Sequence, residues 1–345
     1  MEKGFLPNEH LHKLLDVCPP TMRWDGKEDV TAWQAGAREK LAELLGLNEI
    51  AKSAVEPEVA IEFDKINDDM GCREIRFRYS TEKNVTVPCH LVIPNGAEKP
   101  LPVVITLQGH STGMHISLGR PKWPGDEATC KGGDRDFVVR AVKEGVCGIA
   151  LEQRCFGENG GSISNGNPDC RDVSMRAIIL GRTLVGERVW DVMRLIDVLE
   201  KNFADIVDVQ KVMCLGNSGG GTATTYATAM DERIKVGVPS CAVCRYADSI
   251  GAMLHCECNY VPKIAKYFDM GDLCAMVAPR TLVVVSGETD PIFPINGAKA
   301  CVDVAREAYK ALDAEEKIVH VIGDGGHRFY ADPSWPHINK ALENL

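Results

Sequence analysis

The chain has 345 residues, of which 45% are hydrophobic and 26% charged, a composition typical of a globular protein with a large core. Its 39 Lys and Arg stand against 49 Asp and Glu, and no dense basic run occurs, which argues against nucleic acid and anionic membranes as partners. The amino terminus lacks the apolar stretch of a secretory signal, and the 14 cysteines are scattered. We therefore expect a cytoplasmic protein with reduced thiols.

The first part of the chain predicts helices followed by an antiparallel sheet. Residues 9–16 and 30–46 carry apolar side chains at helical spacing, so residues 1–55 are expected to form an amino-terminal helical arm. Residues 72–79 alternate apolar and charged types, and residues 85–94 are rich in β-branched types. These two runs indicate the antiparallel start of a sheet.

After Pro102 the pattern changes to short, continuous apolar runs, which are typical of parallel strands buried on both faces. Residues 184–201 form one apolar stripe with charges opposite, which predicts a covering helix. The fold class is therefore α/β, with a mostly parallel, doubly wound sheet in one domain over residues 56–345. Residues 241–280 are a long excursion that we expect to act as a lid or to line the pocket. The predicted strands are 103–109, 146–153, 211–218, 235–240, 281–288 and 317–324.

One five-residue motif carries the strongest chemical signal. Gly216-Asn217-Ser218-Gly219-Gly220 lies between a predicted strand and a helix of small residues. A G-x-S-x-G motif in that context is a nucleophile elbow, in which a strained turn presents the serine hydroxyl and the glycines leave room for strand and helix. The alternative is a glycine-rich turn with an incidental serine.

A serine nucleophile needs a base and a group that orients the base. Asp290 and His327 follow Ser218 in that order, each in a loop directly after a predicted strand. Loops after parallel strands meet at the carboxyl edge of the sheet, where the active site of an open α/β fold forms. We therefore predict Ser218, Asp290 and His327 as nucleophile, orienting acid and base.

Each partner also has an ordinary structural reading. Asp290 precedes Pro291 and could only initiate a turn, and His327 could be an ordinary loop histidine. His320 lies inside a predicted strand, so we expect it to be packed there. The fallback acids are Asp324 and Glu288.

The tetrahedral intermediate of ester cleavage needs N–H donors for its oxyanion. The expected donors are the backbone N–H groups of Gly219, which follows the nucleophile, and of His110, in the Gln108-Gly109-His110 turn after an earlier strand. We do not expect the imidazole of His110 to take part in the reaction. The alternative is an ordinary turn that ends the strand.

Five potential zinc ligands lie within 18 residues: Cys241, Cys244, His255, Cys256 and Cys258. A Cys-x-x-Cys pair is half of a common structural zinc site. The second cysteine pair, however, has only one intervening residue, and the first follows a buried strand. We therefore favour buried free thiols, no metal and no cofactor.

The motifs LQGH, EQRCFGENGG, GNSGGG, HCECNYVP, GETDPIFP and GGHRFY occur in the order seen in bacterial α/β-hydrolases. Over roughly residues 56 to 340 the chain resembles the dienelactone hydrolase and acetyl xylan esterase-like branch of that superfamily. The resemblance implies the α/β-hydrolase fold and the same roles for Ser218, Asp290, His327, Gly219 and His110. It departs from dienelactone hydrolases in having serine in place of the nucleophilic cysteine, and from many relatives in having Gln108 in place of histidine.

The sequence thus predicts a serine carboxylic-ester hydrolase that acts on small acetyl esters, with acetylated carbohydrate as the substrate that the resemblance suggests. The alternatives are a peptidase of the prolyl-oligopeptidase type, a zinc-dependent protein, and a non-catalytic binding module on the same fold. A homo-oligomer stays open. The residues expected to line the substrate pocket are Gln108, Arg154, Trp190, His255 and Tyr260.

Overall fold

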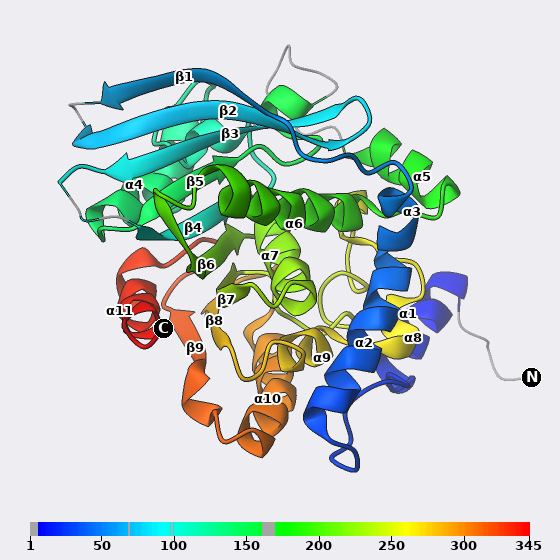
Figure 1. The fold of residues 1–345 in the computed structure, drawn as a ribbon. Helices are drawn as coiled ribbons and strands as arrows, with labels where there is room; N and C mark the ends of the chain where they lie inside the picture. The colour runs from blue at the N-terminus through cyan, green and yellow to red at the C-terminus, as the bar shows by residue number, and fades with distance from the viewer. Residues whose placement is uncertain (1–5, 68–69, 97, 99, 161–169) are drawn as a thin grey trace, which may run out of the picture.

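The computed structural model of the chain describes residues 6–67, 70–96, 98, 100–160 and 170–345, and shows a single twisted sheet flanked by helices (Figure 1). Within these residues nine strands pair in the order β1-β2-β3-β5-β4-β6-β7-β8-β9. The strands are β1 (Val59–Asn67), β2 (Cys72–Glu82), β3 (Val85–Pro94), β4 (Leu101–Leu107), β5 (Cys147–Leu151), β6 (Val207–Asn217), β7 (Ile234–Ser240), β8 (Thr281–Gly287) and β9 (Ile318–Gly323).

The sheet is antiparallel from β1 to β5 and parallel from β5 to β9. The predicted fold class, a mostly parallel sheet with an antiparallel amino-terminal part, is confirmed. The sequence analysis predicts no strand before residue 72, so β1 is an addition. Its side chains are largely exposed and its pairing with β2 is interrupted between Ile61 and Phe63, so it lacks the burial pattern of a core strand.

Helices cover both faces of the sheet. One face is packed by α2, α6, α7 and α10, and the opposite face by α4 and α11. The helices are α1 (Pro7–Val17), α2 (Val30–Leu45), α3 (Leu47–Ala51), α4 (Phe137–Lys143), α5 (Arg171–Ile179), α6 (Leu184–Asn202), α7 (Gly219–Met230), α8 (Ile264–Tyr267), α9 (Met270–Ala275), α10 (Ile295–Ala311) and α11 (Ala331–Glu343).

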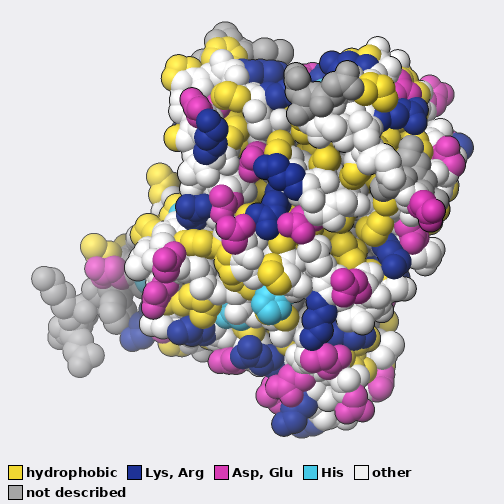
Figure 2. Space-filling model, turned by 90° about the vertical axis from the view of Figure 1, so that its left-hand side faces the viewer, with side chains coloured by type: hydrophobic (Ala, Val, Ile, Leu, Met, Phe, Trp, Pro, Cys, Tyr) yellow, Lys and Arg dark blue, Asp and Glu magenta, His cyan; other side chains and the backbone are white. Residues whose placement is uncertain are grey.

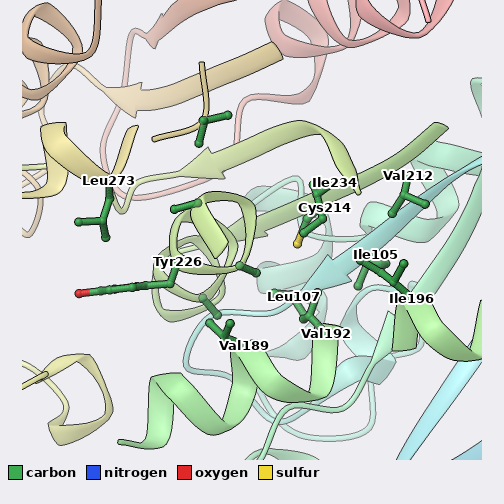
Figure 3. Packing of buried hydrophobic residues seen from close by; sticks show 14 of the residues in the cluster. Ile105, Leu107, Val189, Val192, Ile196, Val212, Cys214, Tyr226, Ile234 and Leu273 are labelled. Atoms are coloured by element: carbon green, nitrogen blue, oxygen red, sulfur yellow. The ribbon is translucent and has the colours of Figure 1, made fainter. Parts of the chain in front are cut away.

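The side chains of the central strand β6 contribute alternately to the two hydrophobic clusters, one on each face of the sheet. Val212 and Cys214 face the α6 side, whereas Met213 and Leu215 face the α11 side. Successive side chains of a strand point to opposite faces, so a continuous apolar run fits only a strand covered on both sides. Figure 3 shows one of these layers, with Val189, Val192 and Ile196 of α6 beside β4, β6 and α7.

The predicted helix at residues 30–46 is α2, which packs into the main core. Asp29 caps its first turn by accepting a hydrogen bond from the Ala32 N–H at 3.0 Å. Trp33, Ala37 and Leu41 are buried in the same cluster as α6 and α7. The amino-terminal segment therefore contributes to the layer that supports α7.

On the face in Figure 2, basic and acidic side chains are interspersed with apolar ones. Among the described residues, no helix combines the length and the apolar character needed to cross a bilayer. The fourteen cysteines all lie within the described part of the chain, and no disulfide joins any two of them.

Candidate active site

Ser218 occupies a strained turn between β6 and α7. Its backbone has φ 56° and ψ −123°, a conformation that costs a non-glycine residue of order 1–3 kcal/mol and is concentrated at functional sites. The Ser218 N–H donates to the Ser240 carbonyl at the end of β7 at 2.8 Å, which fixes the turn against the neighbouring strand. This is the geometry expected of a nucleophile elbow.

The glycines around Ser218 are required by close backbone contacts. A Cβ at Gly216 would lie 2.4 Å from the Gly220 carbonyl oxygen, and one at Gly220 would lie 2.0 Å from the Leu107 carbonyl oxygen. Both distances are far inside van der Waals contact, so any side chain would push α7 off β6 or β4. The motif therefore has a packing reason as well as a chemical one.

Asp290 and His327 form a hydrogen-bonded pair at the carboxyl edge of the sheet. Nδ1 of His327 lies 2.8 Å from Oδ2 of Asp290, and the other carboxylate oxygen accepts the N–H groups of Ile292 and Phe293. The Asp290 side chain is fully buried, while that of His327 is 21% exposed. Burial alone would raise the pKa of Asp290, but these hydrogen bonds hold its pKa below the ordinary value. The acid is thus ionised and oriented toward the imidazole.

Phe293 and Cys241 complete the surroundings of this pair. The Phe293 ring stacks on His327 at 5.9 Å between centroids. The side-chain ligand atoms of Cys241, Asp290 and His327 lie within 4.8 Å of one another. The Cys241 thiol lies 3.1 Å from the Arg328 carbonyl oxygen, and burial followed by the charge of Asp290 raises its pKa to about 12. Cys241 is therefore a neutral thiol beside the acid.

The turn after β4 lies directly against the elbow. A Cβ at Gly109 would meet the Asn217 carbonyl oxygen at 2.7 Å and the Ser218 Cβ at 2.9 Å. A Cβ at Gly219 would meet the His110 ring at 2.8 Å. The two predicted oxyanion donors, Gly219 and His110, therefore lie side by side next to the serine.

The His110 imidazole has its own cluster of partners. Its Nε2 lies 3.2 Å from the sulfur of Cys258 and 3.9 Å from that of Cys170. Cys256 belongs to the same group, whose four ligand atoms all lie within 4.8 Å of one another. Burial alone would lower the pKa of His110, but the contacts with Cys170 and Cys258 raise it to about 9.

Three of the predicted pocket residues have internal partners. Gln108 is buried, and its amide contacts Ser117 Oγ at 2.6 Å and the Arg135 carbonyl at 2.7 Å. The Arg154 guanidinium pairs with Asp191, Glu82 and Glu187. Trp190 of α6 donates its indole N–H to the Thr81 carbonyl at 3.3 Å. These contacts hold β2, β5 and α6 together.

The remaining two predicted pocket residues lie on the 241–280 excursion. His255 is buried against Phe293, with the ring centroids 5.3 Å apart, and so lies next to the ring that stacks on His327. Tyr260 lines a cavity of about 260 Å³ together with Leu15 of α1 and other residues of the excursion. His255 is therefore the pocket candidate that the structure brings toward the Asp290–His327 pair.

Arg135 is a site residue that the sequence reasoning missed. Its Nε donates to Gln108 at 3.0 Å, but its buried Nη2 has no hydrogen-bond partner among the described residues. A Cβ at Gly109 would meet that Nη2 at 3.1 Å as well as Ser218. An unpaired buried donor beside the nucleophile is suited to a substrate oxygen. No sequence signal marks it, because Arg135 lies in a loop before α4 and outside every motif.

Comparison with known proteins places the fold. No family model matches the chain. A relative in Bacillus subtilis (strain 168), named "Putative hydrolase YtaP", is 24% identical over 213 residues, 61% of this chain and 67% of the relative. A "putative acetyl xylan esterase" structure from Bacteroides fragilis NCTC 9343 has a TM-score of 0.77 at 17% identity, covering 96% of this chain and 86% of that one.

Two further solved structures share the arrangement. A glucuronoyl esterase from Solibacter usitatus has a TM-score of 0.67 at 16% identity and covers 95% of this chain and 97% of its own. Acetyl Xylan Esterase 1 from Thermoanaerobacterium sp. JW/SL YS485 has a TM-score of 0.60 at 14% identity and covers 99% of each chain. The strand order, the elbow after β6 and these neighbours together show that the chain has the α/β-hydrolase fold.

Proposed function

We propose that the chain is a serine carboxylic-ester hydrolase with Ser218 as nucleophile, His327 as base and Asp290 as the orienting acid. The observation that carries the proposal is the 2.8 Å contact between His327 Nδ1 and Asp290, in loops at the same sheet edge as the strained Ser218 turn. The Ser218 turn and the loops with Asp290 and His327 follow β6, β8 and β9 at the same edge of the sheet, and a serine, a histidine and an acid at one edge are what acyl transfer needs.

In the first half-reaction, Ser218 Oγ attacks the ester carbonyl and gives its proton to Nε2 of His327. The buried Asp290 carboxylate fixes Nδ1 as the protonated ring nitrogen, so Nε2 is free to accept. The oxyanion forms next to the backbone N–H groups of Gly219 and His110. His327 then gives the proton to the departing alcohol, which leaves the acyl group on Ser218.

In the second half-reaction, water attacks the acyl-serine and gives a proton to His327. Collapse of the second tetrahedral intermediate releases the carboxylic acid and returns the proton from His327 to Ser218. The side chains of this site complete both half-reactions without a cofactor.

For substrates we propose small acetyl esters, with acetylated carbohydrates first. The support is that two of the solved neighbours are described as acetyl xylan esterases. A second candidate is an ester of a uronic acid, in which the sugar supplies the acyl part, because several other neighbours are described as glucuronoyl esterases. Arg135, with its unpaired Nη2 near Ser218, is a donor that an oxygen-rich acyl group could use. We also propose a cytoplasmic location, which would keep the cysteines reduced.

The test compares wild type with Ser218→Ala on p-nitrophenyl acetate and butyrate, and then on acetylated xylo-oligosaccharides and methyl glucuronate. The variant should lose about 1000-fold or more in kcat/KM, because the nucleophile is gone while binding remains. An unchanged rate in the variant would refute Ser218 as nucleophile. Turnover of methyl glucuronate over the acetylated sugar would select the second substrate class, and turnover of a proline-containing peptide amide over both would select the peptidase alternative.

A further inference from the structure

We propose that His110, Cys170, Cys256 and Cys258 form a structural zinc site next to the active site. None of the acyl-transfer steps uses these side chains, so the proposal goes beyond the esterase function. The four residues come from three separate segments: the turn after β4, the start of α5, and the excursion between β7 and β8. The structure describes all four of them.

The geometry fits a tetrahedral ion. With Zn–S of about 2.3 Å and Zn–N of about 2.0 Å, tetrahedral ligand atoms lie about 3.5 to 3.8 Å from one another. The four ligand atoms here all lie within 4.8 Å of one another. The His110 Nε2 is 3.2 Å from Cys258 Sγ and 3.9 Å from Cys170 Sγ, on either side of the ideal spacing. Binding the ion needs only small side-chain movements.

The charge of the surroundings also fits. Zinc with three thiolates and a neutral imidazole carries one net negative charge, which is costly to bury alone. Arg188 of α6 is almost completely buried, and its Nη2 lies 3.4 Å from Cys170 Sγ. Among the described residues no carboxylate ion pair of Arg188 is found, and the guanidinium also contacts the Arg154 carbonyl and Cys258. The guanidinium therefore neutralises the site, which explains a buried arginine among sulfurs.

Four protein ligands leave no position for water or substrate, which is the mark of a structural rather than a catalytic zinc site. Phe156, Leu184 and Cys155 pack around the cysteines and keep the site dry. The His110 ring lies against Gly219 of the elbow, and its backbone N–H is a proposed oxyanion donor. The ion would thus fasten the oxyanion turn to α5 and to the excursion.

The four proposed zinc ligands differ from the five potential ligands that lie close together in the sequence. Cys241 lies beside Asp290 and His327, Cys244 contacts the Pro294 carbonyl, and His255 contacts Ser249 and Asn259. Only Cys256 and Cys258 remain from that set. They are joined by His110, which precedes Cys258 by 148 residues, and by Cys170.

The test is direct metal analysis of the full-length protein purified from zinc-supplemented cells, with no substrate present. Wild type should hold about one zinc per chain, and the Cys256→Ser/Cys258→Ser double variant less than about a tenth of that, because two thiolate ligands are lost. Cys244→Ser is the matched control: it removes a buried cysteine from the same excursion and should keep the zinc.

A second measurement does not depend on the folding of the variants. Wild type stripped of metal under reducing conditions is titrated with Co²⁺, which should give thiolate charge-transfer absorption and the visible bands of a tetrahedral ion at one equivalent. Absence of zinc in wild type after zinc loading, together with absence of these bands, overturns the proposal. So does a Cys170–Cys256 or Cys170–Cys258 disulfide found by peptide mapping of wild type whose thiols are alkylated as the zinc-supplemented cells are lysed. Since metal is measured directly, loss of the esterase proposal would leave this result standing.

Discussion

Two histidine clusters at the carboxyl edge of the sheet use the same side chain in opposite ways. On the carboxylate side, formed by Asp290 and His327, the His327 ring is partly exposed and contacts a buried carboxylate through Nδ1, which leaves Nε2 for the proton transfer that we propose. On the sulfur side, formed by His110, Cys170, Cys256 and Cys258, the His110 residue is also partly exposed, but its Nε2 lies against the sulfurs of Cys170 and Cys258. In our two proposals, the atom that each imidazole contacts decides whether the histidine transfers protons or anchors a loop.

The segments around the Ser218 turn are held in place in two different ways. The loops after β8 and β9, which contain Asp290 and His327, are fixed by close backbone packing, since a Cβ at Gly287 would lie 2.1 Å from the Gly326 carbonyl oxygen. The turn after β4 has two side-chain anchors: Gln108 contacts Ser117 and Arg135, and His110 contacts the sulfur cluster. In our proposal this turn contributes only a backbone donor to catalysis. Variants on the two sides should therefore separate catalysis from positioning.

The largest expected effect is on the carboxylate side. His327→Gln should lower kcat by about 10⁴- to 10⁶-fold, because the general base and acid is removed from both half-reactions. Zinc content should stay at the wild-type value. The measurement is steady-state kinetics on p-nitrophenyl acetate. His337→Gln, which replaces an exposed histidine on α11, is the control and should keep the wild-type kcat. If the kcat of His327→Gln is within tenfold of the wild-type value, His327 is not the general base.

A somewhat smaller loss is expected for Asp290→Asn. The amide can still accept the Ile292 N–H, so the loop keeps its shape, but the imidazole loses the charge that orients it and stabilises its protonated form. We expect kcat to fall by about 10³- to 10⁴-fold. Glu288→Gln is the matched control, because it removes the neighbouring fallback acid at the end of the same strand. If Glu288→Gln shows the larger loss, the acid has been assigned to the wrong carboxylate.

The contact between Asp290 and His327 could be predicted from the sequence, because each residue lies in a motif directly after a predicted strand. A G-x-S-x-G elbow and loops after buried strands converge at one sheet edge, whatever the chain does in between. The parallel strands and α6 were readable for a similar reason, since burial on both faces or on one stripe leaves a clear apolar pattern.

The cluster of His110, Cys170, Cys256 and Cys258 could not be predicted from the sequence, because its residues come from distant segments and form no recognisable motif. Cys170 lies at the start of α5, and nothing local distinguishes it from the other cysteines until the chain is folded. Gln108 and Arg154 show the same limit, since a sequence gives the position of a side chain near a strand end but not its direction. Arg135 was missed because its role depends on an unpaired nitrogen that only packing reveals.

An intermediate effect is expected on the sulfur side. His110→Ala keeps the backbone N–H that we assign to the oxyanion hole but removes the side-chain anchor of the turn. Loss of a positioning contact of this kind typically costs about 10- to 100-fold, so kcat should fall by that amount with KM nearly unchanged. Zinc content, measured on the same preparation, should fall as well. Loss of zinc with full kcat would show that the ion does not position the oxyanion turn.

The smallest effect concerns a third histidine, His320 in β9, whose ring nitrogen lies 3.0 Å from the Ser286 hydroxyl. Burial, followed by the charges of Arg306 and Lys299, lowers the pKa of His320 to about 4, although the charge of Asp303 opposes this shift. The unfolded chain, with an ordinary histidine pKa of about 6.5, therefore binds this proton more readily than the folded chain. The stability that His320 contributes is complete above about pH 6.5 and is lost as the pH falls toward 4.

Replacing it by glutamine keeps a neutral polar partner for Ser286 and removes the titration. Between about pH 7.5 and 4.5, the unfolding free energy of wild type should fall by about 1 to 2 kcal/mol more than that of His320→Gln, allowing for partial exposure of the ring. Urea unfolding across this range measures the difference, with His337→Gln expected to follow wild type. Parallel curves for wild type and His320→Gln would mean that the folded chain accepts this proton as easily as the unfolded one.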